Sequence, residues 1–104
     1  IITGSARGIG LPTAFLFEEH GYKVAIVDKD KKEIDNLSLK NKDIKKFCYD
    51  ISDNDHLDKM YSEILDWHNR VDVLVNNAGI ADFGPIEETN FKRLAEVMRT
   101  NLNG

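Results

Sequence analysis

Three glycines near the start of the chain have the spacing of a phosphate-binding turn. Gly4, Gly8 and Gly10 form a Gly-x-x-x-Gly-x-Gly array that follows the apolar pair Ile1-Ile2 and precedes a stretch with helical character. Such a turn needs residues that tolerate unusual backbone angles, and phosphate oxygens must approach its backbone without meeting a Cβ atom. The first turn of the following helix then offers free N–H groups and the positive end of its dipole. The array predicts a site for the pyrophosphate of a dinucleotide.

An acidic residue ends the next apolar run. Asp28 lies 18 positions after Gly10, where a carboxylate would accept hydrogen bonds from the hydroxyls of an adenosine ribose and would repel a 2′-phosphate. The alternative is a strand-end carboxylate that only caps the next helix. Arg7, beside the turn, could pair with a 2′-phosphate or stand in solvent. The sequence favours NAD as the cofactor over NADP.

The elements that must position these residues alternate between short apolar runs and helical stretches. Strands are expected at residues 1–2, 24–27, 44–49 and 71–75. Helices are expected at residues 9–20 and 30–39, from a cap at Ser52 or Asp53 to about residue 69, and from a cap at Thr89 or Asn90 to near residue 104. A loop is expected between the last strand and the last helix, over residues 76–88.

Continuously apolar strands that alternate with helices are typical of a parallel sheet covered on both faces. The fold class is therefore α/β, a Rossmann-type doubly wound parallel sheet with the strand order 3-2-1-4. Residues 1–104 are expected to form a single partial dinucleotide-binding domain, truncated at both ends, within a longer enzyme.

Composition narrows the range of partners. The net charge of −4 argues against nucleic acid, which is bound through an excess of Lys and Arg. No apolar run approaches the length of a membrane span, so no membrane partner is expected. Cys48 is the single cysteine and cannot form an internal disulfide; it is interpreted as a small core residue, and the location is predicted to be cytoplasmic. The three histidines lack the spacing of metal ligands, and no metal site is predicted.

Two motifs together resemble the short-chain dehydrogenase/reductase family. They are "TGSARGIG" at the start and "NNAG" at residues 76–79, and the resemblance covers the whole chain. It implies that the first turn, the ends of the second and third strands and the second motif contact the cofactor. The residues are Thr3, Gly4, Ser5, Arg7, Gly8, Ile9, Gly10, Asp28, Asp50, Ile51, Asn77, Ala78 and Gly79.

Within this set, the resemblance implies that Ile9 lies on the nicotinamide side and that Asp50 and Ile51 contact adenine. It further implies that Asn101, in "RTNLNG", is a catalytic residue that holds a water in a proton relay. The alternatives are a helix-capping role for Asp50, a loop role for Asn77 and an ordinary helix-end role for Asn101.

The reaction that the resemblance implies is hydride transfer between a nicotinamide and an alcohol or carbonyl carbon. It uses a Ser and a Tyr-x-x-x-Lys pair. The three tyrosines are followed four positions later by Ile26, Asp53 and Leu65, so this spacing is absent from the 104 residues. The chain is expected to carry the cofactor-binding part and to be inactive alone.

The implied partners are a small-molecule alcohol or carbonyl substrate and further copies of the full-length protein, as a homo-oligomer (dimer or tetramer). The alternative function is a non-catalytic dinucleotide-binding sensor or partner-binding module, because one fold can host both uses.

Overall fold

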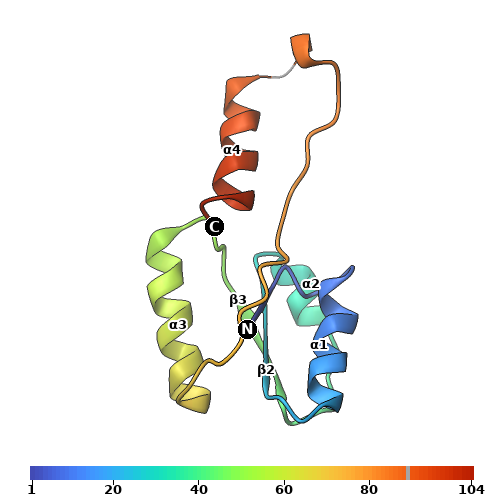
Figure 1. Cartoon of the computed structure of the whole chain (residues 1–104), viewed down its shortest axis with the longest axis vertical. Helices are drawn as coiled ribbons and strands as arrows, with labels where there is room; N and C mark the ends of the chain where they lie inside the picture. Colours follow the sequence, from blue (N-terminus) through green and yellow to red (C-terminus); the bar gives the residue numbers. More distant parts are fainter. Residues whose placement is uncertain (89) are drawn as a thin grey trace.

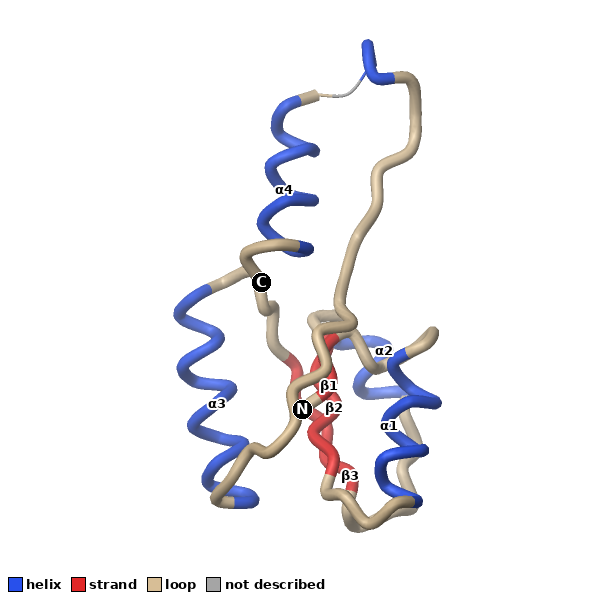
Figure 2. Tube along the Cα trace, in the orientation of Figure 1, coloured by secondary structure: helices blue, strands red, loops and turns tan. Residues whose placement is uncertain are grey.

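Three short parallel strands form the sheet at the centre of the molecule (Figure 2). The computed structural model describes residues 1–88 and 90–104. The strands are β1 (Ile2–Thr3), β2 (Val24–Asp28) and β3 (Ile44–Cys48), in the order β1-β2-β3. Ile2 pairs with Ile26, and Val24 pairs with Ile44. Strands that follow one another in parallel need crossover connections, which here contain helices.

Helices cover both faces of the sheet, as the sequence predicts (Figure 1). α1 (Gly10–Glu19) and α2 (Lys31–Asn36) pack on one face, and α3 (Asn54–His68) packs on the other. β2 supplies both cores, because successive side chains of a strand point to opposite faces. Val24 and Ile26 lie in the cluster with α1 and α2. Ala25 and Val27 lie in the cluster with α3.

The fourth predicted strand is not a strand of this sheet. Within residues 71–75, only Val75 forms a parallel bridge, with Ile2. The N–H of Thr3 donates to the carbonyl of Val75 at 3.1 Å, and the N–H of Val75 donates to the carbonyl of Ile1 at 2.9 Å. The amino group of Ile1 also donates to the carbonyl of Val73 at 2.9 Å, so residues 73–75 run beside β1 with a single bridge and not as a full strand. The order 3-2-1-4 therefore stays a prediction.

Two local predictions also need correction, and a third, the cap of the last helix, is confirmed at one of its two alternatives. α2 ends at Asn36 instead of continuing to residue 39, because Leu37 has extended backbone angles. Cys48 is exposed and is not a core residue, because it is the last residue of β3, in which only Ile44 and Phe47 are buried. Asn90 caps the last helix, its side chain accepting from the N–H of Arg93 at 2.8 Å, whereas Thr89 lies outside the described residues.

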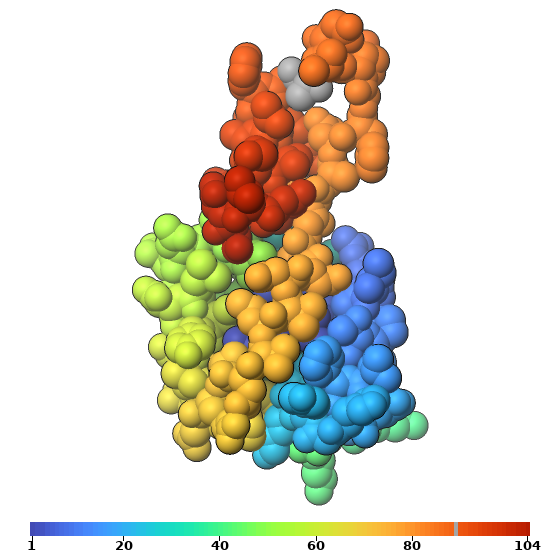
Figure 3. All heavy atoms as spheres, in the orientation of Figure 1, coloured from blue at the N-terminus to red at the C-terminus, as the bar shows by residue number. Residues whose placement is uncertain are grey.

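The last quarter of the chain stands apart from the sheet and its helices. Residues 76–88 rise along one side and contain a short 3-10 helix (Ile86–Glu88), and α4 (Phe91–Asn101) descends beside them. Figure 3 shows both segments above the body formed by the sheet and its helices. The whole molecule measures 48 × 26 × 23 Å. No helix in the described ranges has both the length and the apolar character that crossing a bilayer requires.

Candidate functional site

A cavity of about 580 Å³ lies at the carboxyl ends of β2 and β3, beside the turn that follows β1. In open parallel sheets, ligands bind in crevices outside the carboxyl ends of the strands. Ten of the residues predicted to form a site line this cavity. They are Gly4, Arg7, Gly8, Ile9, Asp28, Asp50, Ile51, Asn77, Ala78 and Gly79.

Ser5 is fully buried and does not line the cavity. Its hydroxyl donates to the carbonyl of Ile2 at 2.6 Å and accepts from the N–H of Val27 at 3.2 Å. These bonds join the glycine turn to β1 and β2. Ser5 therefore supports the glycine turn on the side facing the sheet, and a cofactor in the cavity would not contact it.

Thr3 and Asn77 tie the glycine turn to residues 76–79. The hydroxyl of Thr3 accepts from the N–H groups of Asn77 and Ala78 at 3.2 and 3.1 Å. In return, the side-chain amide of Asn77 donates to the carbonyls of Thr3 and Gly4 at 2.9 and 3.0 Å. The two family-like motifs, more than 70 residues apart in the sequence, are thus held together as one unit.

The first turn of α1 faces this unit. Gly10 begins the helix and also lies outside the cavity lining. Ile9 occupies the N-cap position and provides no side-chain hydrogen bond to the first N–H groups. Free N–H groups at a helix N-terminus attract anions, in particular phosphates. Behind the turn, the backbone at Gly4 approaches Ala78 so closely that a Cβ atom would lie 2.6 Å from its Cα.

Asp28 presents a fixed carboxylate to the cavity. One carboxylate oxygen accepts from the N–H of Ala6 at 3.2 Å, and the other accepts from the N–H of Asp30 at 3.1 Å. Each carboxylate oxygen has two lone pairs, so both retain acceptor capacity for ligand hydroxyls. Because Ala6 belongs to the glycine turn, this bond directly connects the turn predicted to hold phosphate with the carboxylate predicted to hold ribose.

Asp50 is a second carboxylate on the cavity wall. Burial would raise the pKa of its carboxyl, but the hydrogen bonds from Ser52 together with the nearby charges of Lys29 and Arg99 outweigh burial and lower that pKa. The hydroxyl of Ser52 donates to Asp50 at 2.7 Å, and its N–H donates at 2.9 Å. Asp50 does not cap α3, because the side chain of Asp53 accepts from the N–H of Asp55 there. Asp50 is therefore an ionised acceptor at neutral pH.

Asn101 joins the C-terminal end of α4 to the segment formed by residues 76–88. Its side-chain oxygen accepts from the N–H of Ile80 at 2.8 Å, and its amide donates to the carbonyl of Ile80 at 2.7 Å. Asn101 is exposed and does not line the cavity. In the described residues it acts as a clamp, and its predicted role in a proton relay stays a prediction.

The cavity also has walls that the sequence analysis did not identify. They are Val27, Lys29, Asp30, Tyr49, Ile80 and Thr100. Several of these are sequence neighbours of predicted site residues, and this proximity was the only sequence signal that could have identified them as lining residues. Thr100 comes from α4, and no pattern in the sequence indicates that its side chain would be buried there.

Tyr49 does not replace the missing catalytic tyrosine. A tyrosine that transfers a proton near neutral pH needs a lowered pKa. A hydrogen bond with Glu63, together with burial, instead raises the pKa of Tyr49 to about 12. Its phenol therefore stays protonated.

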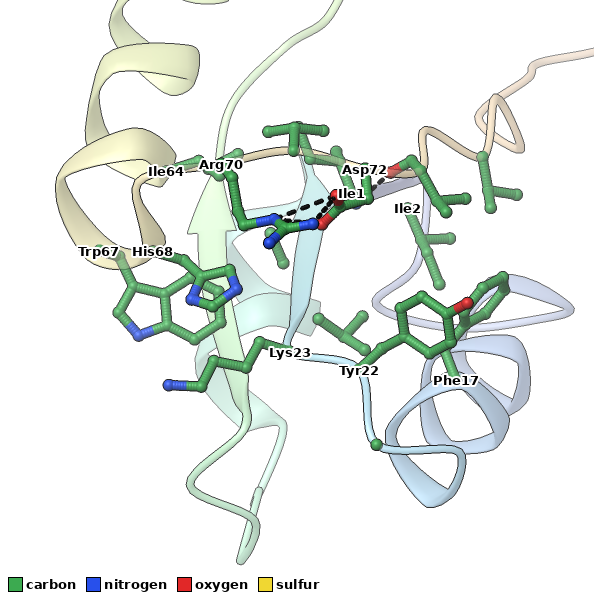
Figure 4. A pocket seen from close by; sticks show the side chains of 16 residues that line it. Ile1, Ile2, Phe17, Tyr22, Lys23, Ile64, Trp67, His68, Arg70 and Asp72 are labelled. Atoms are coloured by element: carbon green, nitrogen blue, oxygen red, sulfur yellow. Dashed lines mark hydrogen bonds and ion pairs between the residues drawn. The ribbon is translucent and has the colours of Figure 1, made fainter.

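A second cavity, of about 280 Å³, lies at the opposite, amino ends of the strands (Figure 4). Ile1, Tyr22 and Trp67 are among the residues around it, and the ion pair of Arg70 and Asp72 lies at its edge. None of the predicted site residues lines this cavity. The larger cavity is thus the candidate site.

A parallel sheet covered by helices, with a glycine turn at its carboxyl edge, defines a Rossmann-type α/β protein. The family model for short chain dehydrogenases matches residues 1–104. The chain therefore belongs to the short-chain dehydrogenase family.

Individual proteins of the family are similar over the whole chain. The 3-oxoacyl-[acyl-carrier-protein] reductase FabG of Staphylococcus epidermidis is 34% identical, with 100% of this chain and 45% of the relative covered. An uncharacterized oxidoreductase of Thermotoga maritima is 32% identical, over 100% of this chain and 42% of the relative. The chain thus spans less than half the length of these relatives.

Solved structures show the same fold. The crystal structure of 3-ketoacyl-(acyl-carrier-protein) reductase from Brucella melitensis, complexed with NADH, has a TM-score of 0.91 and 30% identity. The match covers 97% of this chain and 43% of that one.

Proposed function

We propose that this chain is the cofactor-binding part of an NAD-dependent oxidoreductase that acts on an alcohol or carbonyl substrate. The observation that carries the proposal is the fixed carboxylate of Asp28 at the wall of the larger cavity. The relatives that are named reductases support a carbonyl substrate. The non-catalytic module has no such support among the named relatives.

The residues of the cavity fit a dinucleotide. The glycine turn and the uncapped N-terminus of α1 suit a pyrophosphate, and two carboxylates suit hydroxyl and amino donors. When bound, the nicotinamide would supply or accept the hydride. This chain would hold the adenosine half between Asp28 and the Asp50-Ile51 pair and would position the nicotinamide half near Ile9. Residues 1–104 lack the Ser and Tyr-x-x-x-Lys of the proton transfer, so substrate turnover would need those residues.

NAD is proposed over NADP because the Asp28 carboxylate would repel a 2′-phosphate. Arg7 and Lys29 line the same cavity and would oppose that repulsion. Within the residues that the structure describes, neither of these long side chains forms an ion pair with Asp28, whereas the carboxylate is anchored at both oxygens. The proposal includes the cytoplasmic location that the composition favours and the homo-oligomer that the family resemblance implies.

The test is the affinity of the full chain for NADH and NADPH, measured by cofactor fluorescence. Wild-type protein is expected to bind NADH at least about tenfold more tightly, since one repelled charge and its lost hydrogen bonds exceed about 1.4 kcal/mol. Asp28→Asn should reduce this preference. Asp35→Asn is the matched control, because Asp35 lies on α2 and pairs with Lys31 outside the cavity.

Two results would contradict the proposal in different ways. A preference for NADPH, or a ratio that Asp28→Asn leaves unchanged, would overturn the assignment of NAD. Binding of neither cofactor would overturn the cofactor-binding function itself.

A further inference from the structure

Thr100 has a buried hydroxyl without a partner. The residue is only 6% exposed, and within residues 1–88 and 90–104 its Oγ1 atom has no hydrogen bond. It is the sole buried side-chain oxygen or nitrogen in this condition among those residues. Buried polar groups are nearly always hydrogen-bonded, and a helical threonine commonly bonds to a carbonyl one turn earlier. The orphaned hydroxyl therefore indicates a partner that the chain itself does not provide.

The position of Thr100 indicates what that partner is. Thr100 lines the same cavity as Asp28 and Asp50. It also lies near Ile51, which follows β3, since both residues approach Gly104. A Cβ atom built on Gly104 would be 2.5 Å from the carbonyl oxygen of Thr100 and 3.0 Å from Cδ1 of Ile51. This is the adenosine side of the cavity in the proposed binding mode.

The backbone that carries Thr100 is anchored. The neighbouring residue, Asn101, is bonded to both backbone groups of Ile80, which also lines the cavity. The last turn of α4 is thus fixed against the cavity wall. A hydroxyl held in this way loses little freedom when a ligand arrives, which favours binding.

We propose that the Thr100 hydroxyl forms a hydrogen bond with the adenosine half of the bound cofactor and so helps to set cofactor affinity. The inference rests on the proposed function. A hydroxyl can donate or accept, and adenine and its ribose offer both kinds of group. Thr100 is a binding residue here, because the hydride is transferred at the other end of the cofactor.

The experiment compares two substitutions in the full chain. Thr100→Val keeps the shape and removes the hydroxyl, and Thr100→Ser keeps the hydroxyl. NADH is titrated by fluorescence and ADP-ribose by calorimetry. Thr100→Val is expected to weaken both ligands by the same factor, about three- to tenfold, which is the usual effect of one hydrogen bond. Thr100→Ser should stay within about twofold of wild type.

Each outcome decides the inference. It is overturned if Thr100→Val binds ADP-ribose as tightly as wild type, which would show that water satisfies the hydroxyl. A loss for NADH but not for ADP-ribose would overturn the assignment to the adenosine half. If Thr100→Val does not fold, Thr100→Ala against Thr100→Ser provides the same comparison. Wild-type protein that binds neither ligand would overturn the proposed function, and the inference with it.

Discussion

Two glycines of the turn have the same backbone conformation but different surroundings. Gly4 and Gly8 have φ angles of +62° and +60°, a region that side chains with a Cβ atom rarely adopt. At Gly4 a Cβ atom would lie 2.6 Å from the Cα of Ala78, whereas at Gly8 it would meet nothing within 4 Å. A side chain at Gly4 would therefore force the backbone near Ala78 to move, whereas at Gly8, which lines the cavity, there is open space for one.

Alanine at the two positions should therefore separate stability from binding. Gly8→Ala is expected to lower the free energy of unfolding by about 1–2 kcal/mol, the cost of a left-handed residue. Gly4→Ala should cost more, because backbone must also move at residues 76–79. Urea unfolding measures both. NADH titration of Gly8→Ala should show weaker binding, since its new methyl group points into open space along the cavity lining.

Equal unfolding costs for the two variants would contradict this account, because the close approach of Gly4 to Ala78 would then have no energetic consequence. Unchanged NADH affinity in Gly8→Ala would show that the cofactor does not approach the backbone at this point.

At the scale of elements, α4 is joined to residues 76–88 at two points. Arg93 donates to the carbonyl of Ala81, and two bonds between Asn101 and Ile80 hold the C-terminal turn of α4 at the cavity wall. Asn101→Ala removes both bonds. The amide of Ile80 should then exchange its hydrogen about tenfold faster, because one hydrogen bond is worth about 1 kcal/mol.

Hydrogen exchange measured by NMR tests this prediction. Asn103→Ala is the control, since Asn103 is an exposed asparagine just beyond the same helix. The amide of Thr3, which bonds to Val75, should be unaffected in both variants. Slow exchange at Ile80 in Asn101→Ala would mean that packing, and not the clamp, holds this segment.

The sequence predicts elements well where one pattern determines them. The apolar run at β2, the Asp53 and Asn90 caps and the glycine turn are local signals, and each appears where it is expected. Ladder formation at residues 71–75 depends on how far β1 extends beside them, which periodicity does not encode.

The residues of the site likewise divide into those that local motifs predict and those that they do not. The cavity lining at Gly8 and Asp28 follows from sequence motifs. The inward burial of Ser5 and the contribution of Thr100 depend on three-dimensional contacts between distant segments, and no local pattern specifies them.

The whole molecule has a compact part and a projecting part. The sheet is covered by α1 and α2 on one face and by α3 on the other. α4 instead leaves apolar side chains exposed, with Phe91 89% and Leu102 70% accessible. The candidate cavity is built from both parts, because the glycine turn belongs to the first and Thr100 to the second. Cofactor binding is therefore expected to connect them.

Carboxylates spread over the molecule make its stability sensitive to acid. The pKa of Asp72 is lowered by its hydrogen bond with Arg70, and the pKa of Glu96 by its hydrogen bond with Arg93. The pKa of Asp50 is lowered because the bonds from Ser52 and the charges of Lys29 and Arg99 together outweigh its burial. A carboxyl group with a lowered pKa in the folded state stabilises that state when ionised. Its contribution is complete above the unfolded-state pKa and is lost as the pH falls through the folded-state pKa.

The free energy of unfolding should therefore fall as the pH drops from about 5 to 3, because the unfolded-state pKa values lie near 4. Urea unfolding at pH 7, 5, 4 and 3 measures this.

Added salt should reduce the contribution of Asp72 and Glu96 to the free energy of unfolding, because their ion pairs are exposed. The contribution of Asp50 should fall less with salt, because the neutral groups of Ser52 supply its hydrogen bonds and only the effect of the Lys29 and Arg99 charges is screened. Asp50→Asn should make the fall shallower, whereas Asp66→Asn, an exposed carboxylate on α3, should not. A slope that Asp50→Asn leaves unchanged would show that the Ser52 bonds do not stabilise the folded state.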